Sequence, residues 1–288
     1  MFDDTTRPSS MTIPYPHIPP VILSIGPLAL RWYGVMYGVG YVLGYQLART
    51  RTARAILPID KAALDSWIGY LVIGMLVGAR LVYATVYDRP QFERDPLELL
   101  RVWHGGLSFH GAVLGMIVAC ALFAQVHKIR FLAIAELLAL AGTPGLFFGR
   151  LGNFINGELY GRPSNVPWAM VFPADPLHVP RHPSQLYEAL AEGVLLGLII
   201  WMLARWSRAR GWYRSGLLAG AFLVGYGVFR FLLEFTRQPD AQLGLVFGPF
   251  SMGQLLSIGM PVLGILLLAF VARRPSVCGA VHSGDADA

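Results

Sequence analysis

Residues Trp67–Tyr87 read WIGYLVIGMLVGARLVYATVY, and this stretch decides the class of fold. Arg80 is its single charged residue, and the rest is mostly apolar. A helix needs about 20 mostly apolar residues to cross the hydrocarbon core of a bilayer. The stretch therefore predicts a transmembrane helix.

Six further runs of the chain have the same apolar character. They are Leu28–Leu47, Gly106–Ala124, Phe131–Phe148, Leu186–Leu203, Gly216–Phe235 and Met252–Val271. Only 14% of the 288 residues are charged, whereas a soluble domain carries roughly 25%. The sequence thus predicts an all-α integral membrane protein of about seven transmembrane helices, with a head region on the outer side.

Basic residues are concentrated on alternate connections between these runs. The connections after the first, third, fifth and seventh runs hold Arg49, Arg51, Arg54, Lys61, Lys128, Arg130, Arg205, Arg208, Arg210, Arg214, Arg273 and Arg274. The positive-inside rule then predicts a cytoplasmic C-terminus and a periplasmic N-terminus. Because the cations lie in short runs between apolar segments and not on one element, the sequence does not indicate a nucleic-acid partner.

Three regions follow from this topology. We expect an outer arm at 1–27, a seven-helix membrane domain at 28–274, and a disordered cytoplasmic tail at 275–288. Within the membrane domain, the long connection 151–184 is rich in proline, asparagine, glycine and aromatic residues. That composition predicts a folded periplasmic head above the membrane.

The ionisable residues of the runs lie near one face of the predicted bilayer. Runs that start outside carry them at their starts, and runs that end outside carry them at their ends: Tyr33, Arg80, His110, Arg150, Glu188 with the neighbouring amide Gln185, Arg230 and Glu234. Glu136, in the cytoplasmic half of the fourth run, and Glu192, deeper in the fifth run, are the exceptions. A charge at the membrane centre costs about 3 kcal/mol, so several charges at one level need partners or a wet cavity. We expect a cavity with more arginines than its buried glutamates need, which suits an anionic headgroup.

Three alternatives explain the same residues. Ion pairs such as Arg230 with Glu234, or Arg80 with Glu188, can simply join helices. A transporter for an anionic solute can also line a cavity with arginine, but transporters more often have a midplane site between inverted repeats, and no convincing repeat is evident. A lipid-binding scaffold can hold a phosphate without turning it over.

The densest polar motif follows the fourth run. Residues 149–162 read GRLGNFINGELYGR, in which glycines alternate with arginine, asparagine and glutamate. Glycine permits a close approach of backbone to ligand, asparagine donates and accepts hydrogen bonds, and arginine supplies fixed charge. Turn formation alone explains such glycines and asparagines less well when charges accompany them at a membrane exit.

His110 lies in the second polar motif, HGGLSFHG at 104–111. Ser108 is two residues from His110, and helical residues at that spacing point apart, which argues against a serine–histidine dyad. No cysteine or carboxylate at suitable spacing completes a metal site with His104 and His110, so no metal is predicted.

With these motifs, the chain resembles the bacterial phosphatidylglycerol–prolipoprotein diacylglyceryl transferase family. The signature is Gly149–Gly161, and the resemblance extends to Trp32–Gly34, Gly105–Gly111, Arg181–Glu188 and Gly225–Arg230. It implies a multi-pass enzyme of the inner membrane that moves a diacylglyceryl group from phosphatidylglycerol, a membrane lipid, to a thiol. The thiol belongs to the lipobox cysteine of a prolipoprotein signal peptide, glycerol 1-phosphate leaves, and lipoprotein maturation begins. No cofactor is required.

The resemblance also implies the functional residues. By motif they are Tyr33, His110, Arg150, Asn153, Glu158, Gly161, Tyr226, Arg230 and Glu234. His110, Arg150 and Arg230 are the expected catalytic residues: the imidazole as base for the thiol, and the arginines as the phosphate clamp. The other six are expected to bind or orient substrate. The segment between Phe172 and Arg181 is shorter than the family pattern, which bears on contacts with the prolipoprotein.

Overall fold

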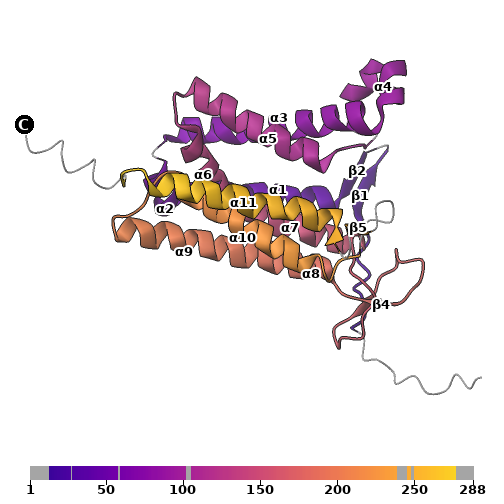
Figure 1. Ribbon diagram of the computed structural model, residues 1–288. Helices are drawn as coiled ribbons and strands as arrows, with labels where there is room; N and C mark the ends of the chain where they lie inside the picture. Colours follow the sequence, from indigo (N-terminus) through magenta and orange to yellow (C-terminus); the bar gives the residue numbers. More distant parts are fainter. Residues whose placement is uncertain are drawn as a thin grey trace, which may run out of the picture. The chain divides into compact units, whose positions relative to one another are not determined.

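The computed structural model (Figure 1) describes residues 13–26, 28–57, 59–101, 105–238, 245–247 and 250–276. Most of the predicted tail at 275–288, with Cys278, and the first half of the predicted arm at 1–27 lie outside these residues. The chain divides into two compact units. The first unit comprises Met1–Leu47 and Ala139–Ala288, and the second comprises Ala48–Leu138.

Helices dominate both units. In chain order they are α1 (Trp32–Ala48), α2 (Arg51–Ile56), α3 (Lys61–Val82), the π-helix η1 (Tyr83–Tyr87), α4 (Arg89–Arg94), the 3-10 helix η2 (Pro96–Leu100), α5 (Phe109–Val126), α6 (Phe131–Ala141), α7 (Thr143–Ile155), α8 (Ser184–Glu188), the π-helix η4 (Ala189–Leu195), α9 (Leu196–Ala209), α10 (Leu217–Leu233) and α11 (Met252–Ala272). Three short antiparallel pairs accompany them: β1 (Val21–Ile25) with β2 (Leu28–Arg31), β3 (Met170–Val171) with β4 (Pro180–Arg181), and β5 (Leu245–Phe247) with β6 (Phe250–Ser251).

The prediction of an all-α membrane protein is confirmed at the level of four or five spans. Among the described residues, four helical segments are long and apolar enough to cross a membrane: Lys61–Tyr87, Phe109–Val126, Ser184–Ala209 and Gly253–Ala272. The pair α6 and α7, bent by 44°, makes a fifth if it forms one span. Helix α10 is apolar but shorter, and α1 has 17 residues, so the count of seven stays a prediction.

The first predicted run differs from the structure at its start. Leu28–Arg31 forms strand β2, which pairs with β1 across a turn in which Gly26 has φ +58°. Helix α1 begins only at Trp32. The apolar residues before Trp32 were indistinguishable from a helix by composition, because a short hairpin strand uses the same residue types.

Glycines allow the two long helices of the second unit to touch along their backbones. A Cβ atom at Gly74, Gly78, Gly111 or Gly115 would overlap the facing helix, because Gly74 and Gly78 of α3 lie against Gly111 and Gly115 of α5. Small residues at such contacts are typical of helix pairs in membranes. These glycines therefore let α3 and α5 pack closely, and the two helices run side by side in Figure 1.

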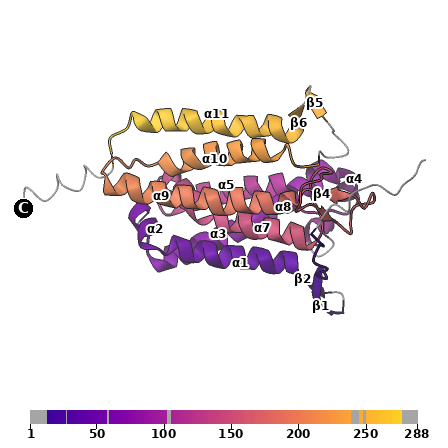
Figure 2. The same ribbon diagram turned by 90° about the horizontal axis from the view of Figure 1, so that it is seen from below.

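The helices of the first unit pack closely against one another, and several of them contact α7. Helix α10 lies between α11 and α9 in both views (Figures 1 and 2). Gly193 on η4 lies against Phe147, so α7 and η4 approach closely. The segment after α7 is anchored by an aromatic cluster in which Tyr15 donates a hydrogen bond of 2.6 Å to the carbonyl oxygen of Phe154. These contacts fix the end of α7, where the signature motif begins.

Candidate active site

Three helical segments contribute charged side chains to one cluster in the first unit. Arg150 comes from the last turns of α7, and Glu188 and Glu192 come from the continuous helix α8–η4. Arg230, Glu234 and Arg237 follow one another at helical spacing along the end of α10 and the turn after it. We call these six residues the arginine–glutamate cluster. Their spacings place the members of each segment on a single face.

Glu188 is the centre of the cluster. Its Oε2 lies 2.9 Å from Nε of Arg150 and 3.2 Å from Nη1 of Arg230, while its Oε1 lies 3.7 Å from Nη1 of Arg237. The Glu188 side chain is only 1% exposed, whereas the side chains of Arg150 and Arg230 are 17% and 15% exposed. Two guanidinium groups from different helices thus converge on one oxygen of a fully buried carboxylate, while both arginine side chains stay partly exposed.

The other two carboxylates complete the charge balance. Glu234 Oε2 lies 3.0 Å from Nη2 of Arg230, which confirms the predicted i, i+4 pair. Glu192 Oε2 lies 3.8 Å from Nη2 of Arg150. Among the described residues, three arginines therefore face three glutamates in this cluster. This differs from the expected excess of arginine, because Glu192 was predicted to lie deeper than the site.

The signature motif folds into a polar turn beside the cluster. Nδ2 of Asn153 donates to Oε1 of Glu158 at 2.9 Å, and Nδ2 of Asn156 donates to the same oxygen at 3.2 Å. Gln185 donates to the Glu158 carbonyl oxygen at 2.6 Å, which ties the turn to α8. Glu158 itself is exposed, so its second carboxylate oxygen is available to a ligand hydroxyl.

Two glycines of the motif are required by close contacts. A Cβ atom at Gly152 would lie 2.8 Å from the ring of Tyr33, so the missing side chain gives Tyr33 its place next to α7. Gly161 donates from its backbone N–H to the His182 carbonyl oxygen at 2.9 Å, and a Cβ there would overlap Thr236. The geometry thus gives Gly161 a packing role that holds the chain just before Arg237.

The structure places eight of the nine predicted site residues in the first unit. Arg150, Arg230 and Glu234 belong to the cluster, Tyr226 lies near it, and Asn153 and Glu158 lie near the Tyr33 hydroxyl. His110 belongs to the second unit, where it is an exposed residue in the first turn of α5. Ser108 caps that helix, because its Oγ accepts from the Gly111 N–H at 3.2 Å.

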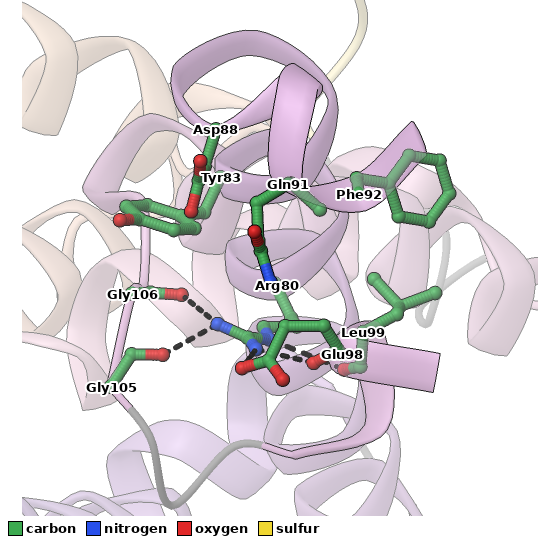
Figure 3. Close-up of a pocket in the computed structure, with 10 residues that line it drawn as sticks. Arg80, Tyr83, Asp88, Gln91, Phe92, Glu98, Leu99, Gly105 and Gly106 are labelled. Atoms are coloured by element: carbon green, nitrogen blue, oxygen red, sulfur yellow. Dashed lines mark hydrogen bonds and ion pairs between the residues drawn. The ribbon is translucent and has the colours of Figure 1, made fainter. Parts of the chain in front are cut away.

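Arg80 is held in a different way (Figure 3). Its Nε donates to the Leu99 carbonyl oxygen at 3.2 Å, and its Nη1 donates to the carbonyl oxygens of Gly105 and Gly106 at 2.5 and 3.0 Å. Its Nη2 donates to the carbonyl oxygens of Glu98 and Arg101 and pairs with the Glu98 carboxylate at 3.2 Å. Arg80 is thus paired with Glu98 in the second unit, and every nitrogen of its guanidinium already donates.

Sequence reasoning missed Arg237 and underrated Glu188 and Glu192 as parts of the site. Arg237 follows Arg230 and Glu234 at i+7 and i+3, a spacing that was available as a signal. Its importance appears only in the structure, where Nη1 approaches Glu188 and Nε lies 3.9 Å from Glu234. Arg162, whose Nε donates to the Arg237 carbonyl oxygen at 2.8 Å, supports this position.

The fold and the cluster define a class of protein: an integral membrane protein with a cluster of partly exposed arginines, whose planar guanidinium groups suit an oxyanion. Comparison with known proteins narrows this class. Residues 20–270 match the family model described as prolipoprotein diacylglyceryl transferase. The chain therefore belongs to the prolipoprotein diacylglyceryl transferase family.

Individual relatives agree along nearly the whole chain. A phosphatidylglycerol–prolipoprotein diacylglyceryl transferase of Azospirillum brasilense is 45% identical over 271 residues, which cover 92% of this chain and 99% of the relative. The corresponding protein of Bordetella bronchiseptica is 47% identical over 263 residues, covering 91% and 98%. That of Geobacter sulfurreducens is 47% identical over 260 residues, covering 90% and 98%.

Proposed function

We propose that this protein transfers the diacylglyceryl group of phosphatidylglycerol to the lipobox cysteine thiol of prolipoproteins and releases glycerol 1-phosphate. Family membership supports the reaction. The structural observation that carries it is the convergence of Arg150 and Arg230 on one oxygen of Glu188. A phosphate oxygen has the same charge as that carboxylate oxygen and accepts the same arginine forks.

The donor phosphate would bind by taking over donors that Glu188 now occupies. Arg150 and Arg230 come from different helices, so together they can grip a phosphodiester from two sides and fix the attached glyceryl carbon. As the phosphate leaves, negative charge grows on it. The two fixed guanidinium groups offset this charge without having to reorganise at the moment of reaction.

Transfer is a displacement at the glyceryl C3 carbon. The cysteine sulfur forms a new bond to C3, the bond from C3 to the phosphate oxygen breaks, and its electron pair leaves with glycerol 1-phosphate. The thiol must lose its proton, and an unperturbed thiol with a pKa of about 8.5 is mostly protonated at neutral pH. We assign His110 as the base that accepts this proton, because an imidazole exchanges protons near neutral pH.

The remaining predicted residues would orient the substrate. Glu158 is exposed and already held by Asn153, so it can accept a hydrogen bond from a headgroup hydroxyl while its orientation stays fixed. Tyr33 lies near both residues, and Tyr226 lies near Arg150 and Arg230. Gly161 and Glu234 hold the arginines in place. No cofactor is needed in this scheme, because the donor lipid carries its own leaving group.

The topology we propose has seven spans in the bacterial inner membrane, with a periplasmic N-terminus and a cytoplasmic C-terminus. Alternating basic connections support it. In a cysteine-free background, a single cysteine at Asn165 should react with an impermeant thiol reagent in intact cells, and one at Thr52 should not. The reverse pattern would contradict the orientation.

A transfer assay with purified protein in detergent tests the function. Phosphatidylglycerol and a peptide with an apolar run, a small residue and a cysteine should give a lipid-modified peptide, detected by mass. A peptide with serine in place of that cysteine should stay unmodified, because a hydroxyl is a far weaker nucleophile near neutral pH. A zwitterionic phospholipid should be a poor donor. If the protein is folded and the peptide stays unmodified under every condition, the transferase proposal is wrong and a transporter is favoured.

The role of His110 is tested in the same assay. His110→Gln should slow transfer by about 10²–10⁴-fold, the usual contribution of a positioned base. A higher assay pH should recover part of the loss by supplying thiolate. His127→Gln is the matched control, because His127 is an exposed histidine that caps the other end of α5. A rate that stays low at every pH would exclude His110 as the base and indicate a positioning role.

A further inference from the structure

Glu192 stands apart from the other carboxylates of the arginine–glutamate cluster. It is fully buried, with a relative exposure of 0%. Among the described residues neither of its oxygens accepts a hydrogen bond, and its ion pair is the long contact of 3.8 Å to Arg150. It also lies on η4, a π-helical segment, and such segments are rare and frequently occur at functional sites.

The surroundings of Glu192 contain both signs of charge. Arg150 faces it from α7, Glu188 from α8, Tyr226 and Arg230 from α10, and Arg237 from the turn after α10. With Glu234, the cluster holds three arginines and three glutamates among the described residues, so its formal charge is zero when all six are ionised. A phosphodiester that entered this cluster would bring one uncompensated negative charge into a poorly hydrated place, where such a charge is costly.

A single proton removes that cost. The carboxylate that gains most from neutralisation is the one that is most buried and least paired, because desolvation penalises the charged form. Glu188 and Glu234 each have an arginine within 3.0 Å, whereas Glu192 has none so close in the described part of the chain. Neutral Glu192 would also release Nη2 of Arg150, which then becomes a donor for the incoming phosphate.

We propose that Glu192 takes up one proton when an anionic phosphodiester headgroup binds, so that binding of the donor lipid is coupled to protonation. This inference rests on the proposed function and adds a positioning and charge-balancing residue to it. The balance is simple: the headgroup adds one negative charge, one proton from water adds one positive charge at the Glu192 carboxyl, and no covalent bond of the lipid changes.

Titration calorimetry without peptide tests the coupling. Short-chain phosphatidylglycerol is titrated into the purified full-length protein at several pH values around neutrality, in buffers of different ionisation enthalpy. The wild-type protein should take up about one proton per lipid, and its Kd should rise about tenfold per pH unit on the alkaline side. Glu192→Gln should bind with a Kd that hardly changes with pH, because its side chain is permanently neutral.

Two further variants keep the test decisive. Glu192→Asp should retain the pH dependence, because it keeps an ionisable carboxyl even if its packing is altered. Glu93→Gln, an exposed glutamate of the second unit paired with Arg89, is the matched control and should behave as the wild type. Infrared difference spectra should show the carbonyl stretch of a protonated carboxylic acid on lipid binding in the wild type and lack it in Glu192→Gln.

The outcomes separate the inference from the proposed function. A wild-type protein that transfers lipid but binds it without proton uptake would overturn the role of Glu192 and leave the transferase intact. Retention of the wild-type pH dependence in Glu192→Gln would overturn that role as well. A protein that neither binds phosphatidylglycerol nor modifies the peptide would instead refute the proposed function itself.

Discussion

Each of the two units holds an arginine near the C-terminal end of a helix, Arg80 on α3 and Arg150 on α7, and the two arginines are held in opposite ways. Arg80 in the second unit donates most of its hydrogen bonds to backbone carbonyl oxygens, whose positions are fixed by the fold. Arg150 in the first unit faces two carboxylates, at 2.9 and 3.8 Å. Side-chain carboxylates can move or gain a proton, whereas backbone carbonyls cannot. The partners of a buried arginine thus indicate whether it can receive a ligand.

The largest effect is expected at the exchangeable arginines. Arg150→Lys or Arg230→Lys keeps the positive charge but loses the planar fork that can grip a phosphate. Each should lower the rate of transfer by about 10²–10³-fold, the usual loss when one group that stabilises transition-state charge is removed. The assay measures kcat and KM with phosphatidylglycerol, and the yield and thermal unfolding of the purified variants should stay close to those of the wild type.

Arg205→Lys provides the matched control for these variants. Arg205 is an exposed arginine on α9 that stacks on Trp201, so its replacement removes a fork without touching the cluster. It should transfer lipid at the wild-type rate. Full activity in both Arg150→Lys and Arg230→Lys would show that these arginines only join helices, and the contrast with Arg80 would then disappear.

A smaller and different effect is expected at Arg80. Lysine has three donors in place of five and cannot reach carbonyl oxygens on both sides, so Arg80→Lys should leave several carbonyl oxygens around Gly105 and Leu99 unpaired. Lost hydrogen bonds to a charged group cost about 1.5–3 kcal/mol each, and partial replacement by lysine or water suggests a net loss of about 3 kcal/mol. Thermal unfolding in detergent measures it.

Headgroup binding separates the two kinds of arginine. The folded fraction of Arg80→Lys should bind short-chain phosphatidylglycerol within about twofold of the wild type, because its guanidinium has no free donor to offer. Arg150→Lys should show the reverse, with near-normal unfolding and weak binding. An Arg80→Lys protein of unchanged stability that failed to bind the lipid would mean that the Arg80 site receives a ligand.

The sequence predicted the class of the fold better than the arrangement of the charged side chains. Apolar run length is a direct consequence of bilayer thickness, so the bounds of α5 and α11 were predicted to within three residues and those of the continuous α3–η1 segment to within six. The motif from Gly149 was interpreted as a ligand-binding segment, which stays a prediction, and its folding into a turn was not predicted. The convergence on Glu188 was not predictable, because it depends on how three helices pack. The complete burial of Glu192 was also not predictable, because a single sequence gives no signal for the π-helical segment on which this residue lies.

The smallest effect concerns a third arginine, Arg181 of strand β4, which sharpens the comparison. Its carboxylate partner, Asp175, accepts from Nε and Nη2 of Arg181 at 2.6 and 2.8 Å and also from the backbone N–H groups of Leu177 and Val179. Both oxygens of this carboxylate already accept hydrogen bonds, so the carboxylate is held as firmly as the backbone carbonyl oxygens around Arg80. Although the pair is ionic, it should therefore behave as structure and not as a ligand site.

The pH dependence of unfolding checks this interpretation. The hydrogen bonds from Arg181 hold the pKa of Asp175 below its ordinary value. A carboxyl whose pKa is lowered by folding adds stability above its unfolded pKa of about 3.9, and that stability is lost as the pH falls through the folded pKa. Asp175→Asn keeps the shape but not the charge, so it should cost about 1.5–3 kcal/mol near neutral pH. The difference in stability from the wild type should shrink below about pH 4, and transfer activity at neutral pH should persist. A stability difference that is the same at every pH would show that the charge of Asp175 contributes nothing.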